Sequence, residues 1–236
     1  MSAAARRVRL WRLGRTPYEE ALELQSRVAA GRAEGREPDT LILLEHPPVI
    51  TLGRNATREN VLFDQAQLAS RGVSLVRCDR GGDATFHGPG QLVAYPILDL
   101  RPDRCRVRRY VSDLEELMIR CCRDFGLEAG RKEGMAGAWL GGPDGEGPWR
   151  KIGAVGVHVR RWITSHGLAL NVTTDLSYYG LINPCGITEH PVTSMAEELS
   201  GDRRPASGEV AERLTVHFAD VFGALVEESS DAPLSS

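Results

Sequence analysis

No stretch of this 236-residue sequence approaches the ~20 consecutive apolar residues that a membrane-spanning helix needs. No secretory apolar core follows Met1, although the first residues are rich in arginine and free of acids, as transit peptides are. The five cysteines include no CxxC pair of the kind that binds zinc or performs redox chemistry. We therefore expect no membrane association and a reducing compartment, which is the cytoplasm, or the mitochondrial matrix if the source is eukaryotic.

Strong net charge and phosphate-binding loops are absent as well. The formal net charge is −3 and the isoelectric point about 6.1, which gives no basis for a nucleic-acid-binding protein. Neither GxGxxG nor GxxxxGK followed by Ser or Thr occurs, and no internal repeat is found. The length suits one large domain, so we predict a single catalytic domain over residues 1–236, with residues 1–7 and 227–236 loosely ordered.

What the sequence does contain is a pair of apolar runs dense in small residues, Ile152–Val159 and Ile163–Val172. Their content of Val, Ile and Leu predicts two strands, joined as a hairpin through Arg160–Trp162. Side chains alternate along a strand, so each run has one aliphatic face and one face of small residues. The small faces consist of Ala154, Gly156, Gly167 and Ala169. If these faces lie side by side, the sheet carries a shallow trough that admits a slim ligand such as an alkyl chain.

Cys185 is the candidate nucleophile, because Pro184 and Gly186 hold it in a tight loop. Lys151 opens the first apolar run, and a nearby ammonium favours the thiolate form of a cysteine. A change of one pKa unit corresponds to about 1.4 kcal/mol of preference for the charged form. The alternatives are a cysteine that serves as a small buried apolar residue and a lysine that reaches solvent at a strand end. The sequence alone leaves open whether the two side chains meet.

Four blocks of the sequence resemble the lipoyl(octanoyl) transferase family and stand in the order found in that family. They are RGGDATFHGPGQLVAYPI at Arg80–Ile97, KIGAVGV at Lys151–Val157, SHGLALNV at Ser165–Val172 and NPCGI at Asn183–Ile187. The resemblance covers about Pro17 to Leu199, which is most of the chain. It implies an α/β (α+β) fold like the catalytic module of biotin and lipoate protein ligases, with one larger and one smaller mixed β-sheet flanked by helices.

The resemblance also implies an activity and its partners. Octanoyl would arrive as a thioester on the phosphopantetheine arm of acyl carrier protein, pass to Cys185, and then to a lysine of a lipoyl domain. The acceptors would be the acyltransferase subunits of 2-oxo acid dehydrogenases and the glycine cleavage H protein. We expect no cofactor, no metal and a monomer. The substrate-binding residues implied by the resemblance are Arg80, Gly81, Gly82, Asp83, Ala84, Thr85, Phe86, His87, Ala154, Val155, Gly156, Gly167, Leu168 and Ala169.

Three other functions stay open. An ATP-dependent lipoate or octanoate ligase of the same fold would activate the acid as an adenylate and need no cysteine. An amidotransferase would move lipoyl groups between protein domains without a carrier. A non-enzymatic protein that binds the carrier or the lipoyl domain would hold Cys185 as plain core.

Several polar residues lie outside the hairpin. His46, beside two prolines, is interpreted as a turn histidine rather than a ligand. His87 is either a proton shuttle, because histidine titrates near neutrality, or a hydrogen-bonded structural residue. Five arginines between Arg101 and Arg109 form a basic run that we hypothesise docks the acidic carrier. Cys121 and Cys122 fall on the apolar face of a helix and are predicted to be core.

The remaining segments predict alternating strands and helices. A helix should begin with Thr16 as N-cap and Pro17 in its first turn and run to about Ala30. The last helix should span about Val210 to Leu225. Further expected elements are strands at Val8–Leu13, Leu41–Leu44, Val49–Leu52, Leu75–Cys78 and Leu92–Leu98, and helices at Val111–Phe125 and Ser194–Gly201.

Overall fold

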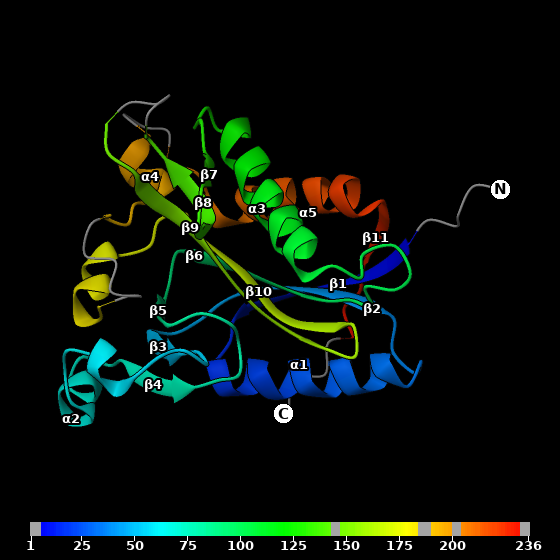
Figure 1. The fold of residues 1–236 in the computed structure, drawn as a ribbon, viewed down its shortest axis with the longest axis horizontal. Coiled ribbons are helices and arrows are strands. Elements are labelled where there is room, and N and C mark those ends of the chain that lie inside the picture. The colour runs from blue at the N-terminus through cyan, green and yellow to red at the C-terminus, as the bar shows by residue number, and fades with distance from the viewer. Residues whose placement is uncertain (1–5, 143–146, 184–189, 200–203, 232–236) are drawn as a thin grey trace.

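The structure is a computed structural model of the chain and describes residues 6–142, 147–183, 190–199 and 204–231. Within these residues the chain forms two mixed β-sheets with helices packed on them, as expected from the sequence (Figure 1).

The secondary structure elements follow the expected alternation of strands and helices. The strands are β1 (Arg6–Arg15), β2 (Asp39–Glu45), β3 (Val49–Leu52), β4 (Ser74–Arg77), β5 (Ala84–His87), β6 (Gln91–Ile97), β7 (Gly130–Lys132), β8 (Met135–Leu140), β9 (Arg150–Arg160), β10 (Ile163–Asn171) and β11 (Ala224–Glu228). The helices are α1 (Tyr18–Ala33), α2 (Gln65–Ala69), α3 (Val107–Asp124), α4 (Met195–Glu198) and α5 (Ser207–Phe222), with 3-10 turns η1 (Arg58–Asn60) and η2 (Leu176–Leu181). The larger sheet has the strand order β11-β1-β2-β6-β10-β9-β8-β7 and the smaller the order β4-β3-β5.

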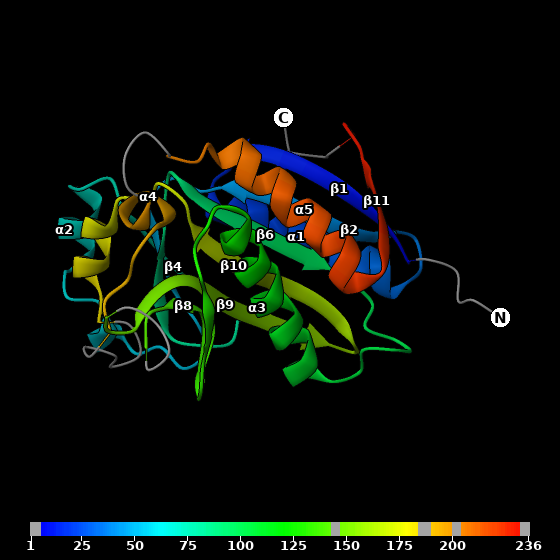
Figure 2. The same cartoon turned by 90° about the horizontal axis from the view of Figure 1, so that it is seen from above.

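Helices cover both faces of the larger sheet. Helices α3 and α5 lie on one face, and α1 lies on the other (Figure 1, Figure 2). Leu43 and Leu168 belong to the core cluster that contains α3 and α5, whereas their chain neighbours Ile42 and Ala169 belong to the cluster that contains α1. This alternation between the two clusters is the period of two that a strand imposes on its side chains.

The hairpin expected from the two apolar runs is confirmed. Strands β9 and β10 are antiparallel, and their register places Gly156 opposite Gly167 and Ala154 opposite Ala169. The two strands turn through Arg161 and Trp162, which both have positive φ, of 51° and 68°. The small faces of the two strands therefore do lie side by side, on the face of the sheet opposite α3.

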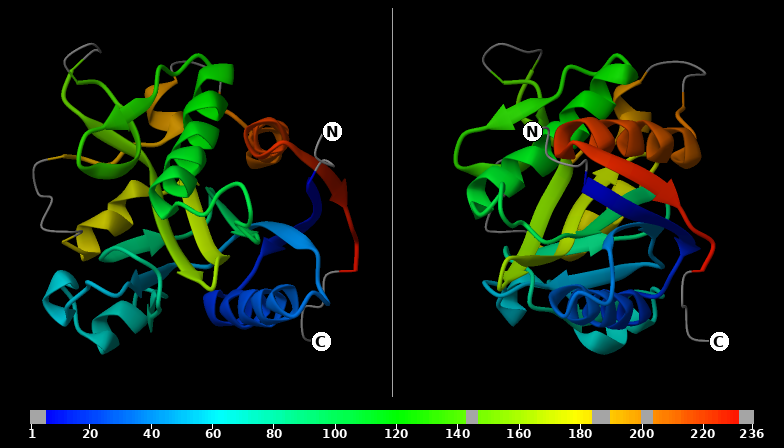
Figure 3. Two further views of the ribbon diagram at one scale, coloured as in Figure 1. Left: turned by 45° about the vertical axis from the view of Figure 1, so that its right-hand side comes forward. Right: turned by 90° about the vertical axis from the view of Figure 1, so that its right-hand side faces the viewer.

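The ends of the chain differ from expectation. Arg6 and Arg7, expected to be loosely ordered, pair in β1 with Ala224 and Leu225 of β11, which the sequence pattern had assigned to the end of a helix. Helix α5 ends earlier, because Gly223 takes a left-handed φ of 59°, and β11 then runs beside β1 at the sheet edge (Figure 3). Loose ordering was therefore wrong for residues 6–7 and 227–228.

The start of α1 also differs. Pro17 is its N-cap, one residue later than predicted, and it makes no side-chain cap. The hydroxyl of Thr16 instead donates to the carbonyl of Leu13 at 3.3 Å, so the prediction of Thr16 as N-cap is wrong. The helix predicted from Ser194 is confirmed in its start, because the Ser194 hydroxyl caps α4 by accepting from the amide of Glu197.

Candidate functional site

A cavity of about 120 Å³ opens on the small-residue face of the β9–β10 hairpin. It receives residues from both sheets and from the start of α1. Of the residues predicted from sequence, it is lined by Arg80, Gly82, Asp83, Ala84, Thr85, His87, Lys151, Ala154, Val155, Gly156, Gly167, Leu168 and Ala169. It is also lined by residues that the sequence reasoning did not single out, among them Tyr18, Tyr95, Trp139, His166, Tyr179 and His190.

The floor of this cavity is low because the side chains that point into it are glycine and alanine. A Cβ on Gly156 would lie 3.1 Å from Cδ of Arg80 and 3.1 Å from the carbonyl oxygen of Gly81, so these groups cover Gly156 closely and leave little room for a side chain there. A Cβ on Gly167 would lie 2.1 Å from the carbonyl oxygen of Ala94, so this position requires glycine. The lining extends from Lys151 to His166, which pairs with Val157. Six residues of strand separate Lys151 from Val157, or about 20 Å at 3.3 Å per residue. The residues that line the cavity are therefore spread along the hairpin.

Lys151 faces the cavity because of an irregularity in the sheet. Gly153, Val155 and Val157 point toward α3, so strict alternation would send Lys151 to that face too. However, β9 pairs with β8 through Ala138 opposite Gly153 and Trp139 opposite Lys151, a shift that leaves one extra residue in β9. Such a bulge redirects a side chain. Here it turns Lys151 to the face that carries Ala154 and Gly156.

The surroundings of Lys151 are aromatic. Its Nζ lies 5.1 Å from the ring centroid of Trp139, and the ring of His190 stands edge-on to the same indole at 5.8 Å. On the other side of the strand, the Lys151 amide donates to the carbonyl of Pro191 at 2.9 Å, and its carbonyl accepts from the amide of Thr193 at 2.9 Å. The backbone of Lys151 is thus held between β8 and residues 191–193.

Cys185, the predicted nucleophile, lies outside the described residues, as do residues 184 and 186–189. The described residues on each side of this stretch are at the cavity. The amide of Asn183 donates to the carbonyl of Asn60 at 2.7 Å, and the Asn60 side chain in turn donates to Asp83 of the cavity wall at 3.1 Å. His190, on the far side, lines the cavity beside Trp139.

Arg80 organises the glycine loop that forms one wall. Its guanidinium is 7% exposed and donates to the hydroxyl and carbonyl of Thr51, to the carbonyl of Gly81 at 3.1 Å and to that of Asp83 at 2.7 Å. Gly53 has no room for a side chain, because a Cβ there would lie 2.5 Å from the carbonyl oxygen of Gly82. The buried charge of Arg80 therefore ties β3 to the loop before β5.

Three buried histidines lie at the end of the cavity remote from Lys151. His46 donates from Nδ1 to the carbonyl of Thr16 at 2.7 Å and accepts from the Tyr95 hydroxyl at 2.9 Å. Burial lowers its pKa to about 4, against an opposing contribution from the Thr16 hydrogen bond, so His46 is neutral and structural. Burial, and after it the positive charge of Arg80, also lowers the pKa of His87 well below its ordinary value. Nδ1 of His87 lies 2.7 Å from the side-chain oxygen of Gln91, and this hydrogen bond together with the burial favours the structural interpretation.

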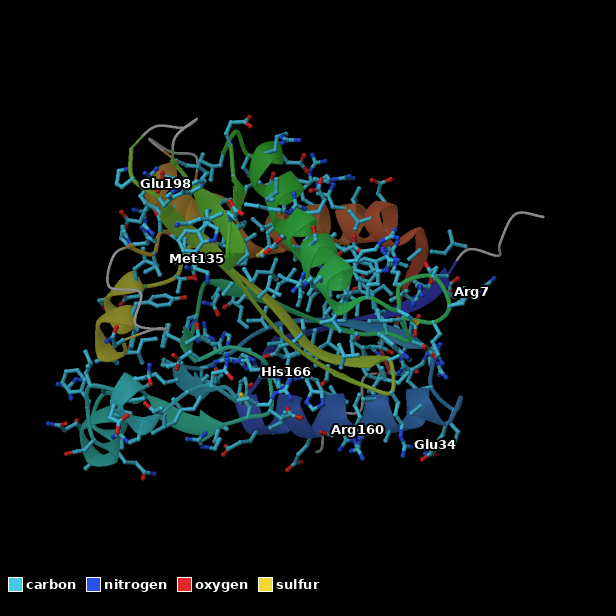
Figure 4. All side chains as sticks on the ribbon, viewed as in Figure 1. Arg7, Glu34, Met135, Arg160, His166 and Glu198 are labelled. Atoms are coloured by element: carbon cyan, nitrogen blue, oxygen red, sulfur yellow. The ribbon has the colours of Figure 1, made fainter. Side chains whose placement is uncertain are left out.

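His166 is the third of these histidines, and its backbone is unusual. It has a φ of 58° within β10, where its amide donates to the side chain of Gln25 in α1. Its Nε2 lies 2.8 Å from the carboxylate of Asp79, which also approaches His158 at 2.5 Å. Burial lowers the pKa of His166, while the hydrogen bond to Asp79 opposes that effect. Figure 4 labels His166 in the layer that faces α1 and the smaller sheet.

Two residues predicted to bind substrate are not among the described residues that line the cavity. Phe86 is buried in the core of the smaller sheet, where its ring stacks on Tyr178 at 4.7 Å. Gly81 contributes its backbone instead, because its amide donates to the carbonyl of Val157 at 2.9 Å and joins the loop to β9. Phe86 belongs instead to the core cluster of the smaller sheet, which also contains Leu181 of η2.

The basic run is not a uniform surface. Arg104 is 7% exposed and donates to Asp113 and to the carbonyl of Val221, so it belongs to the fold. Arg106, Arg108 and Arg109 are exposed at the start of α3. They lie at the start of α3, the helix that covers the face of the sheet opposite the cavity.

Cys121 and Cys122 are core residues, as the helix pattern predicts. Cys121 and Cys122 are fully buried, and burial raises the pKa of Cys122 to about 12, so neither is a nucleophile. Among the described residues, no group of three His, Cys, Asp or Glu side chains is placed to hold a metal ion. Within the same ranges, no helix has the length and apolarity to cross a membrane.

Comparison with known proteins gives a consistent family. Residues 17–219 match the model of the lipoyl protein ligase A/B catalytic domain. A protein of Solibacter usitatus named octanoyltransferase is 51% identical over 213 residues, which cover 90% of this chain and 92% of that protein. An octanoyltransferase of Koribacter versatilis is 49% identical over 91% of this chain and 84% of its own length. The bipartite lipoate protein ligase of Thermoplasma acidophilum has the same fold, with a TM-score of 0.73 at 18% identity over 95% of this chain and 86% of that one.

Proposed function

The chain belongs to the lipoyl protein ligase A/B catalytic domain family, and on this premise we propose that it transfers an octanoyl group to a lysine of a lipoyl domain. The enzyme is an acyltransferase, and relatives as similar as 51% identical carry the name octanoyltransferase. The structural observation that carries the proposal is a cavity lined by the small residues of the hairpin, where Ala154 pairs with Ala169 and Gly156 pairs with Gly167. The cavity floor leads to Lys151, a lysine turned into the cavity by a bulge.

The proposed reaction has two transfers. The thiolate of Cys185 attacks the carbonyl carbon of an octanoyl thioester on the phosphopantetheine arm of acyl carrier protein. The carrier's C–S bond breaks, the carrier thiolate takes up a proton, and an octanoyl–Cys185 thioester remains. The lysine amine of the lipoyl domain then attacks this thioester, loses a proton, and forms an amide as the Cys185 sulfur leaves. Because a thioester is converted to an amide, the transfer runs downhill without ATP.

Lys151 has two roles in this scheme. As an ammonium it favours the thiolate of Cys185, and as a neutral amine it takes the proton from the attacking lysine. The floor of the cavity holds the alkyl chain. Seven buried CH₂ and CH₃ groups contribute roughly 5–6 kcal/mol at about 0.8 kcal/mol each, which is enough to select for chain length.

The partners follow from the same proposal. The donor is the acyl carrier protein, and the acceptors are the lipoyl domains of 2-oxo acid dehydrogenase acyltransferase subunits and of the glycine cleavage H protein. The enzyme acts as a monomer in the cytoplasm and needs no cofactor of its own. Carrier docking on the basic run would rest on Arg106, Arg108 and Arg109, which are its exposed members on α3.

Intact-mass spectrometry after incubation with octanoyl-loaded carrier tests the proposal. We expect one covalent octanoyl group on the wild-type chain and none on Cys185→Ala. Cys105→Ala is the matched control, because Cys105 is the described cysteine that is not buried and should leave the adduct unchanged. A Cys185→Ala chain that still carries one octanoyl group, or a wild-type chain that never acquires one, would contradict the proposed intermediate.

A turnover assay separates the rival activity. A lipoate or octanoate ligase shares the fold, as the Thermoplasma acidophilum ligase does, but activates a free acid with ATP. Turnover that needs ATP and free octanoate, with full activity in Cys185→Ser, would assign this chain to the ligases instead.

A further inference from the structure

We propose that Trp139 and Gly137 of β8 are positioning residues for Lys151: the indole face holds the ammonium, and the glycine makes room for the lysine stem. This inference rests on the proposed catalytic role of Lys151 and goes beyond it by assigning the residues that aim and charge that side chain.

The register of β8 and β9 supplies the first argument. Trp139 is the direct partner of Lys151, and opposite residues of an antiparallel pair project to the same face. Nζ of Lys151 lies 5.1 Å from the centroid of the Trp139 ring, within the ~6 Å over which a ring face attracts a cation. Trp139 is only 1% exposed, and its Nε1 donates to the carbonyl of Met135, so the ring itself is fixed.

Gly137 supplies the second argument, because it stands two residues before Trp139 on the same strand. A Cβ on Gly137 would lie 2.8 Å from Cε of Lys151 and 2.3 Å from the carbonyl oxygen of Gly153. Its φ of 127° is one that other residues rarely adopt. The stem of Lys151 therefore passes over Gly137 before the ammonium reaches Trp139.

A buried carboxylate holds this arrangement in place from the other face of the sheet. The amide of Gly137 donates to Oε1 of Glu115 in α3 at 2.9 Å, and Glu115 is 8% exposed and paired with Arg131 at 3.2 Å. Residues 137–139 are thus anchored to α3 at the point where the ladder shifts. The bulge, the glycine and the indole act together to direct one lysine.

The consequence is a change in how readily Lys151 exists as an ammonium. Attraction to the ring quadrupole acts on the charged form and not on the neutral amine. Removing the indole should therefore let the neutral amine appear at lower pH, by about 0.4–1.5 pH units for an interaction of the usual strength.

Competitive amine labelling across a pH series, read by peptide mass spectrometry, measures this directly. The sequence has only two lysines, Lys132 and Lys151, so Lys132 serves as the internal reference. In Trp139→Leu we expect the pH midpoint of Lys151 labelling to fall by about 0.4–1.5 pH units, with the Lys132 midpoint unchanged. Trp139→Phe, which keeps a weaker ring face, should give a smaller shift and recover part of the lost turnover. Trp162→Leu, at the exposed hairpin tip, is the matched control and should change neither.

A graded series guards against a Leu variant that fails to fold. Replacing all four tryptophans with analogues of increasing fluorine content keeps their size and weakens the ring face stepwise. The Lys151 midpoint, read on the absolute pH scale, should fall with each added fluorine. Lys132 is no reference in this series, because its Nζ lies 5.9 Å from the ring of Trp149, which is fluorinated too. A flat series, or a Trp139→Leu midpoint equal to wild type in a folded chain, would overturn the inference.

The failure of the proposed function would look different. If Lys151→Gln retained full octanoyl transfer, the catalytic role of Lys151 would be wrong while the labelling shift in Trp139→Leu would persist. If Lys151→Gln abolished transfer but the labelling midpoint ignored Trp139, the proposed function would stand and the positioning role would fall.

Discussion

Replacing Ala154 with leucine should convert the octanoyl site into one for shorter chains. Ala154 lies on the cavity face of β9, opposite Ala169, and is half-buried, so a larger side chain there enters the cavity rather than the core. The added isobutyl bulk would occupy space that the alkyl chain otherwise fills. The change should therefore act on chain length and leave the fold intact.

The magnitude follows from the number of carbons displaced. Leucine adds three carbons to alanine, and excluding three chain carbons at about 0.8 kcal/mol each costs about 2.4 kcal/mol. At about 1.4 kcal/mol per factor of ten, kcat/KM for the octanoyl donor should fall roughly 60-fold. A butanoyl donor is too short to reach the blocked region, so its kcat/KM should change by less than a factor of about three.

The assay compares kcat/KM for butanoyl, hexanoyl and octanoyl carrier in wild type, Ala154→Leu and a control. Val157→Leu is the control, because it lies on the same strand but points toward α3. Thermal unfolding of all three chains checks that the fold is kept. An Ala154→Leu chain that is folded and retains the wild-type ratio of octanoyl to butanoyl turnover would refute the assignment of the trough as the acyl site.

Three further outcomes are expected. His46 has an ordinary pKa of 6.5 and a buried value of about 4, so the unfolded chain binds the proton first and stability falls as pH drops from 6.5 to 4. The pKa difference of 2.5 corresponds to about 3 kcal/mol of unfolding free energy. Urea unfolding at pH 7 and pH 4.5 should therefore show a smaller decrease in the free energy of unfolding for His46→Gln than for the wild type. An equal decrease would show that other groups dominate. Cys121→Ala should lower the free energy of unfolding by about 1 kcal/mol and leave kcat unchanged, since this sulfur is core; a lost activity in a folded chain would contradict that. Replacing Arg106, Arg108 and Arg109 with glutamate should lower kcat/KM for the carrier at low salt if these residues dock it. Unchanged kcat/KM at low salt would contradict the docking hypothesis.

The sequence determined more of the site than of the sheet around it. The alternation of small and large residues in β9 and β10 is local, and a hairpin with a short turn leaves little freedom of register. The hairpin and its small-residue faces were therefore predicted from spacing alone, whereas the pairing of Gly156 with Gly167 came from the structure. The amphipathic spacing of α3 was local in the same way, and Cys121 and Cys122 were correctly placed in the core.

Features that join distant segments were beyond such reasoning. The pairing of β1 with β11 joins residues more than 200 positions apart, and nothing in Ala224–Glu228 marks it as a strand rather than a helix end. The neutral state of His46 and His87 depends on their burial beneath Tyr18 and Tyr95, which come from different elements. The prolines beside His46 predict a turn, but the burial that lowers a histidine's pKa depends on how distant segments pack around it.

The direction of Lys151 shows the division most clearly. Strict alternation along the strand would place Lys151 on the same face as Gly153 and Val155, which is the face under α3. Only the bulge opposite β8, fixed by Gly137 and its hydrogen bond to Glu115, turns the lysine into the cavity. The sequence therefore determined which residues make the trough, because strand alternation is a local property. The tertiary structure decided which face the lysine occupies, because a bulge is set by how two strands and a helix meet.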